Sequence, residues 1–224
     1  MKVAIIQPSY FPWHGYFSIM ASVDIFVFLD DVQYTRRDWR NRNKFEINRR
    51  ADWLTIPVKS HDRETKINKI EINSETNWQE NHLQTFQYNY SKTQFFEDAN
   101  QLFAQIRVDY GNLLSNLTIE TSKCIAKYLD LKVKFFNSSN LGIESNSPSE
   151  RLALITSELG GNFYLSGPTA VNYLDFSYFE KRKIEVCFKD HTYTPYPRAD
   201  HDFLGPLSIL DLISFHGKNS NKFL

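Results

Sequence analysis

Short apolar runs rich in β-branched and aromatic residues recur along this chain, and segments with a helical pattern separate most of them. Strands that are separated by helices need crossover connections, and crossover connections join parallel strands. The alternation therefore predicts an α/β fold with a mainly parallel central sheet. The runs that predict its strands are residues 2–7, 24–30, 131–137, 162–167 and 184–190.

The remaining segments predict one hairpin and a helical block. Residues 44–49 and 52–59 have the pattern of two paired strands, and residues 67–72 that of a further strand. From residue 77 to about residue 130 the pattern becomes helical. We expect this block to be inserted in, or to flank, a single α/β domain of residues 1–224. Further helices are expected at residues 15–22, 147–161, 170–183 and 207–217.

Composition narrows the class of protein. Lysine plus arginine and aspartate plus glutamate both number 26, so the formal net charge is zero. A neutral chain does not favour nucleic-acid or anionic-membrane binding by bulk charge, so any cationic site must be local. The chain has no apolar run of about 18 residues and no signal-peptide pattern, so we expect no membrane span. Cys124 and Cys187 lie far apart in apolar surroundings, which predicts buried free thiols and a cytoplasmic protein.

Three loops follow predicted parallel strands. They are residues 7–16, 30–42 and 166–168. In open parallel sheets, ligands bind beyond the carboxyl ends of the strands, where the strand order reverses. We therefore expect the three loops to converge on one pocket.

The loop of residues 7–16 contains two prolines and a group of large rings. The prolines stiffen the loop and hold its side chains in place. Gln7 and Tyr10 are candidate substrate-binding residues. His14 titrates near neutrality and is a candidate base, and Tyr16 is a candidate donor to an oxyanion. The alternative is that the rings close a core and that His14 is a surface residue without a role.

The stretch from Leu29 to Phe45 places two acids before a cluster of arginines. Guanidinium groups bind phosphate through paired hydrogen bonds and stack on planar rings, so we expect phosphate binding here. Asp30 is a candidate base for an attacking amine. The alternative is a solvated network in which Asp30, Asp31 and Asp38 neutralise the arginines. The candidate substrate-binding residues of this stretch are Asp31, Gln33, Arg36, Arg37, Arg40, Asn41 and Arg42.

The turn at Ser166 and Gly167 leads from a predicted strand into a predicted helix. Hydroxyl and amide groups at such a turn are suited to hold a phosphate or a carboxylate. Ser166 is also a candidate to stabilise an oxyanion, and Asn172 and Tyr173 are candidate substrate-binding residues. The alternative is a plain turn with Ser166 as the N-cap of the helix.

The C-terminal stretch carries histidines and acids. Its Asp200-His201-Asp202 sequence has no second set of ligands beside it, so it does not predict a metal site. Asp211 falls in the middle of an apolar helical pattern. A buried acid at that position needs a partner such as an arginine.

Five blocks in order resemble the WbqC-like family. Members of that family are typically encoded among genes for bacterial O-antigen, the polysaccharide of lipopolysaccharide, and other surface polysaccharides. The resemblance implies a role in making or decorating a nucleotide-activated sugar. The blocks are residues 5–17, 24–45, 54–58, 164–175 and 207–217.

The N-terminal order of strand, aromatic loop, glycine and helix is also similar to the nucleotide-binding unit of HIGH-motif nucleotidyltransferases, which implies a Rossmann-like sheet. Those enzymes bind ATP at a His-x-Gly-His turn. The matching residues here are Trp13, His14, Gly15 and Tyr16, so the glycine is kept and both motif histidines are absent. Their imidazoles stabilise charge on the phosphates, and their loss argues against adenylyl transfer.

Two classes of function fit these features. The first is a transferase that forms an amide, by acyl or aminoacyl transfer, on the amino group of a nucleotide-linked amino sugar. ATP, an acyl carrier or an aminoacyl donor would be the second substrate. Nucleotidyl transfer to a sugar phosphate and glycosyl transfer are the enzymatic alternatives. The second class is a non-catalytic nucleotide-sugar-binding protein, which the absent histidines favour.

Overall fold

The computed structural model describes residues 1–189, 195–199 and 202–224. Contacts within the chain divide it into two compact units. That the whole chain acts as one domain stays a prediction. The first unit consists of residues 1–7, 18–31 and 131–192, and the second consists of residues 8–17, 32–130 and 193–224.

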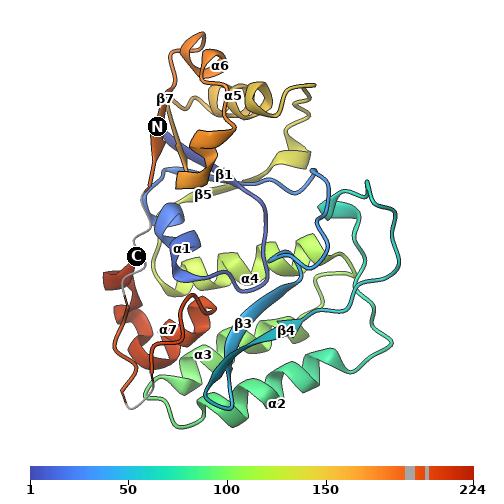
Figure 1. Cartoon of the computed structure of the whole chain (residues 1–224), viewed down its shortest axis with the longest axis vertical. Coiled ribbons are helices and arrows are strands. Elements are labelled where there is room, and N and C mark those ends of the chain that lie inside the picture. Colours follow the sequence, from blue (N-terminus) through green and yellow to red (C-terminus); the bar gives the residue numbers. More distant parts are fainter. Residues whose placement is uncertain (190–194, 200–201) are drawn as a thin grey trace. The chain divides into compact units, whose positions relative to one another are not determined.

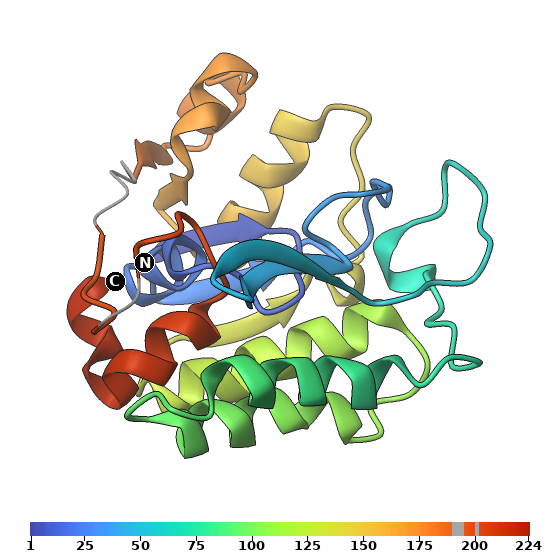
Figure 2. The ribbon, with the colours of Figure 1, turned by 60° about the horizontal axis from the view of Figure 1, so that its bottom comes forward.

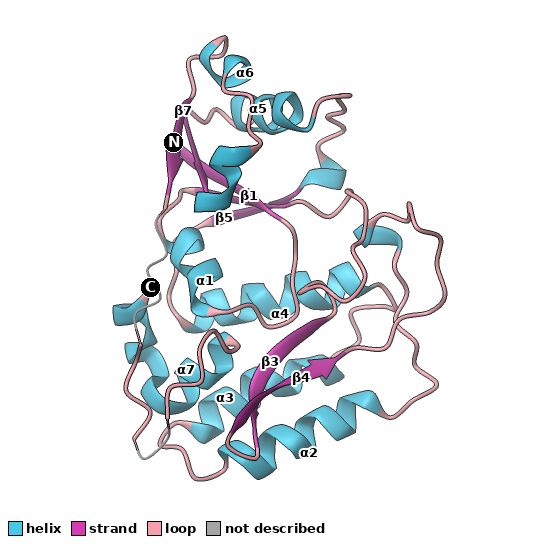
Figure 3. Ribbon diagram, in the orientation of Figure 1, coloured by secondary structure: helices cyan, strands magenta, loops and turns pink. Residues whose placement is uncertain are grey.

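The first unit is built on a sheet of five strands in which every neighbouring pair is parallel (Figure 1, Figure 3). The strand order is β5-β2-β1-β6-β7. Counted by their own succession, the strands lie in the order third, second, first, fourth, fifth, which is that of a Rossmann-like sheet. The predicted α/β fold is confirmed. The strands are β1 (Lys2–Ile6), β2 (Ile25–Phe28), β5 (Lys134–Asn137), β6 (Phe163–Ser166) and β7 (Glu185–Phe188).

The core of the first unit lies between the central strands and α5 (Pro148–Glu158). Val3 of β1 and Ala153 of α5 are both fully buried in it. The helix begins where the sequence predicts, because Ser147 Oγ accepts the Glu150 N–H at 3.3 Å and a proline occupies the first turn. This start fixes which face of α5 meets the sheet.

The single helix predicted over residues 170–183 is wrong. The structure has a 3₁₀ helix, η4 (Pro168–Asn172), and a separate short helix, α6 (Ser177–Glu180). Asp175 interrupts them. Its backbone N–H donates to Ser149 Oγ at 3.0 Å and its Oδ1 accepts the Ser177 N–H at 3.0 Å. An aspartate that bonds to nearby backbone in this way competes with helix hydrogen bonds.

The second unit contains the predicted hairpin, formed by β3 (Arg42–Ile47) and β4 (Arg50–Thr55). Asn48 and Arg49 make its two-residue turn, with φ of 52° and 63°. Two positive φ values match a type I′ turn, whose twist suits paired strands. The hairpin anchors the loop that leads into it, residues 32–41.

Helices pack beside the hairpin in the second unit (Figure 2). They confirm the helical character of residues 77–130. No helix in the described residues is long and apolar enough to cross a bilayer. The helix α1 (His14–Ala21) begins in this unit and ends in the first. The others are α2 (Trp78–Tyr90), α3 (Phe96–Phe103), α4 (Leu114–Tyr128) and α7 (Ile209–His216), with the 3₁₀ helices η2 (Ala104–Arg107) and η5 (Gly217–Phe223).

The strand predicted at residues 67–72 is wrong. The structure has a 3₁₀ helix there, η1 (Ile67–Lys69), followed by isolated bridges. Ile67 and Ile70 are both buried, and their spacing of three places them on one side of a 3₁₀ turn. The spacing of buried residues thus matched a 3₁₀ turn better than an alternating strand.

Large rings of the N-terminal loop close the core of the second unit. Tyr10 and Phe11 have no exposed surface, and the Phe11 ring lies 5.0 Å from Phe103. Asn43 of β3 holds this loop, because its Nδ2 donates to the backbone oxygens of Tyr10 and Phe11. Phe17 is also fully buried. The core interpretation of these rings is confirmed.

His82 of α2 is buried against Tyr10. Its Nδ1 lies 2.9 Å from the Tyr10 hydroxyl, and it also hydrogen-bonds the backbone of Thr55. Both partners suit a neutral imidazole. Burial lowers the pKa of His82 to about 4 from the ordinary 6.5.

We expect acid to destabilise the chain through His82. The unfolded chain binds this proton near pH 6.5 and the folded chain only near pH 4, so the contribution is complete above pH 6.5 and is lost as the pH falls toward 4. The loss is about 3 kcal/mol. Denaturation of the wild type and of His82→Gln at pH 7 and pH 4 measures it. Equal losses in both proteins would contradict a neutral buried His82.

Candidate functional site

The strand order of the first unit reverses between β1 and β6, which run side by side and in parallel. The carboxyl ends of such a pair are where open sheets bind ligands. Gln7 follows β1 and is half-buried, whereas Ser166 ends β6 and is buried. Gly167 follows, and a methyl group added to it would meet no atom within 4 Å. These three predicted residues therefore lie at the edge of the sheet that the fold favours.

Asp30 follows β2 and clamps the turn after β5. Its Oδ1 accepts the Ser139 N–H at 3.0 Å, and its Oδ2 accepts the Ser139 hydroxyl at 2.7 Å. Its own N–H lies 3.2 Å from Ser138 Oγ. The carboxylate is buried, and both of its oxygens have donors. In this geometry Asp30 joins the end of β2 to η3 (Ser138–Asn140), the turn that follows β5.

Asp31 is engaged by an arginine of α5. Its Oδ2 lies 2.5 Å from Arg151 Nη2, and its Oδ1 lies 2.5 Å from Ser138 Oγ. Burial raises the pKa of Asp31, but the hydrogen bonds from Arg151 and Ser138 outweigh it, and the net effect lowers that pKa. Asp31 is therefore an ionised member of an ion pair within the first unit. Neither Ser138 nor Arg151 was among the predicted site residues.

Two candidates of the following segment reach solvent. Asn172 lies at the end of η4, and Tyr173 is its next residue, 69% exposed. They lie in the first unit with Ser166 and Gly167. Their substrate-binding role stays a prediction.

The predicted arginine cluster lies in the second unit, on a loop that we define as residues 33–42 and call the arginine loop. The first residues of the arginine loop are hydrogen-bonded to residues 63–65. The Tyr34 N–H donates to Thr65 O at 2.9 Å, and Gln33 Nε2 donates to Arg63 O at 2.7 Å. Gln33 thus has a structural bond. The arginine loop is therefore held by residues 63–65 at its start and by the hairpin at its end.

Arg36 is oriented by His61. The Arg36 Nη2 donates to His61 O at 2.9 Å, and its Nε donates to His61 Nε2 at 3.3 Å. His61 Nδ1 lies 2.9 Å from Lys59 O, so Nδ1 carries the proton and Nε2 accepts. The guanidinium of Arg36 is exposed and directed by a neutral histidine, which leaves its charge for a ligand.

Asp38 is the one acid within the arginine loop, and it lies near Arg40. Its Oδ2 accepts the Thr35 hydroxyl at 2.6 Å and lies 4.0 Å from Arg40 Nε. Burial raises the pKa of Asp38. The hydrogen bond from Thr35 and the charge of Arg40 lower that pKa by more, so the net effect is downward and the carboxylate is ionised. Burial also lowers the pKa of Arg40, which remains a cation because an arginine starts from so high a value.

Arg42 stacks on an indole. Its guanidinium carbon lies 4.1 Å from the centre of the Trp53 ring, and its Nη2 donates to Arg37 O. The Trp39 and Trp53 rings lie 5.0 Å apart at an angle of 48°. Neither Trp39 nor Trp53 was among the predicted site residues. The hairpin register brings Trp53 opposite β3, and no local sequence signal predicts that.

Asn41 has a structural role in the same loop. It is buried, and its Nδ2 donates to Ile56 O at 2.8 Å. The Ile56 N–H in turn donates to Asn41 O at 2.7 Å. This reciprocal pair extends the hairpin toward the arginine loop.

Positive charge accumulates on the arginine loop. Its four arginines stand against one aspartate, a formal charge of +3. Among the residues that the structure describes, only Arg40 of the four lies within ion-pair distance of a carboxylate. Of the three acids in the alternative network, Asp38 is the one that an ion pair joins to these arginines within the described residues. Asp30 is held by serines and Asp31 by Arg151.

His14 and Tyr16 lie in the first turn of α1 as buried residues, so the alternative of a surface histidine is wrong. His14 meets the Trp13 ring at 5.0 Å and the Tyr196 ring at 6.1 Å, both edge-on. A methyl group on Gly15 would lie 2.3 Å from the Trp13 ring, so indole packing requires the glycine there. Burial raises the pKa of Tyr16, which keeps its hydroxyl protonated.

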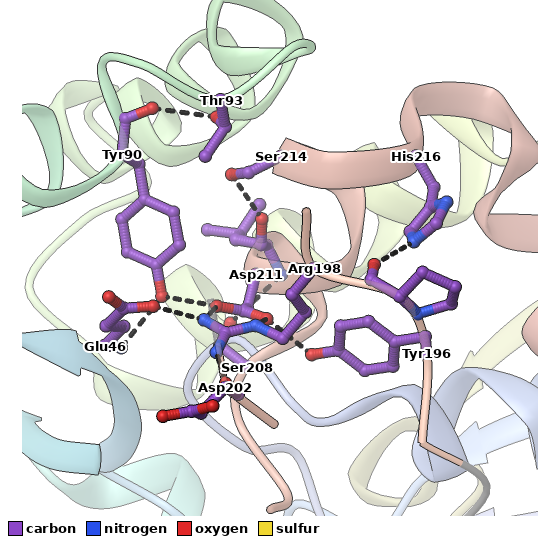
Figure 4. A network of polar contacts seen from close by, with 12 residues as sticks. Glu46, Tyr90, Thr93, Tyr196, Arg198, Asp202, Ser208, Asp211, Ser214 and His216 are labelled. Atoms are coloured by element: carbon purple, nitrogen blue, oxygen red, sulfur yellow. Dashed lines mark hydrogen bonds and ion pairs between the residues drawn. The ribbon is translucent and has the colours of Figure 1, made fainter. Parts of the chain in front are cut away.

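A buried ionic cluster joins three segments of the second unit (Figure 4). Arg198 forms two bonds with Asp211 of α7, from Nε to Oδ2 at 2.9 Å and from Nη2 to Oδ1 at 2.7 Å. The same Nη2 contacts Glu46 of β3. The hydroxyls of Tyr90 and Tyr196 donate to Asp211 at 2.8 and 2.6 Å. The expectation that a buried Asp211 needs an arginine is confirmed.

The electrostatics of this ionic cluster keep Arg198 charged. Burial lowers the pKa of Arg198, but Asp211 and Glu46 raise it by more, so the net direction is upward. The Arg198 and Asp211 side chains are 1% and 0% exposed. Arg198 also donates to the backbone oxygen of Asp202. The cluster pins residues 195–199 to the hairpin and to α7.

The described residues contain no group of three or more histidines, cysteines or acids that could hold a metal ion. His191, Asp200 and His201 lie outside the described residues.

A model of the WbqC-like protein family matches residues 7–223. This chain belongs to the WbqC-like protein family. It is 34% identical over 226 residues to a Mycobacterium tuberculosis (strain ATCC 25618 / H37Rv) protein described as "Uncharacterized protein Rv1507c", a match that covers 100% of this chain and 97% of that protein. No solved structure matches the chain. The resemblance carried by the five sequence blocks is confirmed.

Removing Arg198 should strongly destabilise this WbqC-like chain. In Arg198→Ala, Asp211 stays buried without its guanidinium, and a broken buried pair typically costs about 3–5 kcal/mol. The half-buried Arg182 lies 3.9 Å from Glu150, and Arg182→Ala should cost below about 1 kcal/mol. Urea denaturation of both variants measures the difference. Similar small losses in both would contradict a supporting role for the buried ionic cluster.

Proposed function

We propose that this WbqC-like chain is a transferase of surface-polysaccharide biosynthesis that binds a nucleotide-linked amino sugar and forms an amide on its amino group. The observation that carries the proposal is the charge of the arginine loop. Arg36, Arg37 and Arg42 have no carboxylate within ion-pair distance among the described residues. Clustered guanidinium groups of this kind favour a phosphate-bearing ligand.

The arginine loop supplies charge without a large ordering cost. Arg36 is oriented by His61, and Arg42 is held over Trp53. Preorganised donors lose little side-chain entropy when the ligand binds. We therefore assign the diphosphate of the nucleotide sugar to Arg36 and Arg37, with Arg42 as their neighbour.

The proposed amide chemistry needs a group that takes a proton from the amine and a donor that stabilises the oxyanion. Tyr16 keeps its proton because burial raises its pKa, which suits a donor. Ser166 is a second candidate donor, at the carboxyl end of β6. His14 and Asp30 stay the candidate bases. An acyl carrier or an aminoacyl donor is proposed as the source of the acyl group, with the freed carrier as the leaving group, whereas ATP would serve only to activate a free acid.

A second candidate function rests on the two acids of the first unit. Both oxygens of Asp30 accept hydrogen bonds, and Asp31 is paired with Arg151. Their carboxylate oxygens are already occupied by donors within the first unit, which favours a binding protein without catalysis. Turnover separates the candidates, because only a transferase increases the mass of the nucleotide sugar when an acyl donor is supplied. A cytoplasmic location accords with the free thiols of Cys124 and Cys187.

Replacing an exposed arginine of the loop tests the proposed phosphate site. Arg36→Ala and Arg37→Ala should each weaken binding of a UDP-linked amino sugar roughly tenfold to a hundredfold, because a charge-assisted phosphate contact contributes about 1.5–3 kcal/mol. Arg50→Ala is the matched control, since exposed Arg50 begins β4 at the other end of the hairpin from Arg42. Titration calorimetry measures the affinities. Unchanged affinity in both loop variants would remove the proposed site.

A further inference from the structure

We infer that Trp39 and Trp53 form a stacking platform for the base of a nucleoside diphosphate, beside the arginines that take its phosphates. The inference rests on the proposed function and specifies its ligand. Two aromatic residues were predicted to bind substrate. Tyr10 has no exposed surface, and Tyr173 is 69% exposed but belongs to the first unit. Trp39 is 37% exposed and belongs to the arginine loop itself, so it is an exposed ring next to the arginines in the sequence.

The hairpin holds the inner ring of the platform. Trp53 of β4 lies opposite Lys44 of β3, and Lys44 Nζ lies 5.3 Å from the Trp53 ring centre. Arg42 stacks on the same ring at 4.1 Å. Two cations and a neighbouring indole fix Trp53, so the outer ring, Trp39, rests on a rigid base.

Both the backbone and the ring of Trp39 have partners in the second unit. The Trp39 N–H donates to Asp38 Oδ1 at 2.7 Å, and the Trp39 O accepts the Tyr10 N–H at 3.1 Å. The ring itself lies 5.0 Å from the Trp53 ring. An indole whose backbone and ring already have partners stacks on a ligand at a lower entropic cost.

Arg37 carries backbone strain at the point where the platform meets the phosphate site. Its φ is +57°, in the left-handed region that arginine seldom adopts, and its carbonyl accepts a bond from Arg42. Strained backbone of this kind persists only where its surroundings enforce it, and it concentrates at ligand sites. Arg36 and Arg37 precede Trp39 by three and two residues in the sequence.

The chemistry of such a platform defines the ligand class. Rings stack on the π-face of any base, and a guanidinium binds the phosphates, so the site favours nucleoside diphosphates over pyrophosphate. Stacking alone reads no base edges, so uridine and guanosine diphosphates should bind alike. The platform would therefore recognise the nucleotide handle of the activated sugar, whichever sugar it carries.

Titration calorimetry with UDP and with inorganic pyrophosphate tests the platform. Wild-type chain should bind UDP more tightly than pyrophosphate. Trp39→Ala should weaken UDP binding roughly tenfold to a hundredfold and leave pyrophosphate binding within about twofold, since the loss of one base–aromatic stack has that effect. Trp39→Phe keeps a ring and should retain most of the UDP affinity. Circular dichroism confirms that each variant is folded.

Three results would overturn the inference, and they differ in what they say about the phosphate site. If Trp39→Ala binds UDP like the wild type while Arg36→Ala weakens both ligands, the platform is wrong and the phosphate site remains. If wild-type chain binds neither UDP nor pyrophosphate, both the platform and the proposed phosphate site are wrong. Equal losses for both ligands in Trp39→Ala would also contradict stacking.

Discussion

A guanidinium without access to water holds the second unit together. Arg198 binds Asp211 of α7 and Glu46 of β3, so one charged group joins a helix, a strand and residues 195–199. The same strand carries Arg42 and Lys44, four and two residues before Glu46. Alternate residues of a strand share a face, so the buried ionic cluster and the cations over Trp53 belong to one face of β3. The candidate site therefore depends on a strand that the cluster fixes.

The buried ionic cluster and the arginine loop both contain arginine, but their charges are balanced in different ways. Burying an ion pair costs about as much as it returns unless further hydrogen bonds complete it, and here Tyr90 and Tyr196 donate to Asp211. Arg36 donates to His61 and Arg42 donates to Arg37 O, and neither lies within ion-pair distance of a carboxylate among the described residues. One set of charges is thus complete within the protein, and the other is left for a ligand. That contrast is the physical basis for assigning the loop a binding role.

The parallel sheet and the need of Asp211 for an arginine could be predicted from the sequence, because apolar patterning and the cost of a buried charge act locally. The partner of Asp31 could not. Arg151 lies 120 residues away, and only the packing of α5 brings it near. Trp53 was missed for the same reason, since its place beside Arg42 comes from hairpin register. The prediction of one helix over residues 170–183 was wrong because the side chain of Asp175 accepts a hydrogen bond from the Ser177 N–H and interrupts the helix.

The central claim is that the arginine loop, rather than the edge of the parallel sheet, binds the nucleotide. A crystal structure of the chain with UDP tests this most directly. The account predicts that the diphosphate lies within hydrogen-bond distance of Arg36 or Arg37 and that the uracil ring stacks on Trp39. A nucleotide at the carboxyl ends of β1 and β6, in contact with Gln7 or Ser166 and away from Trp39, would contradict it.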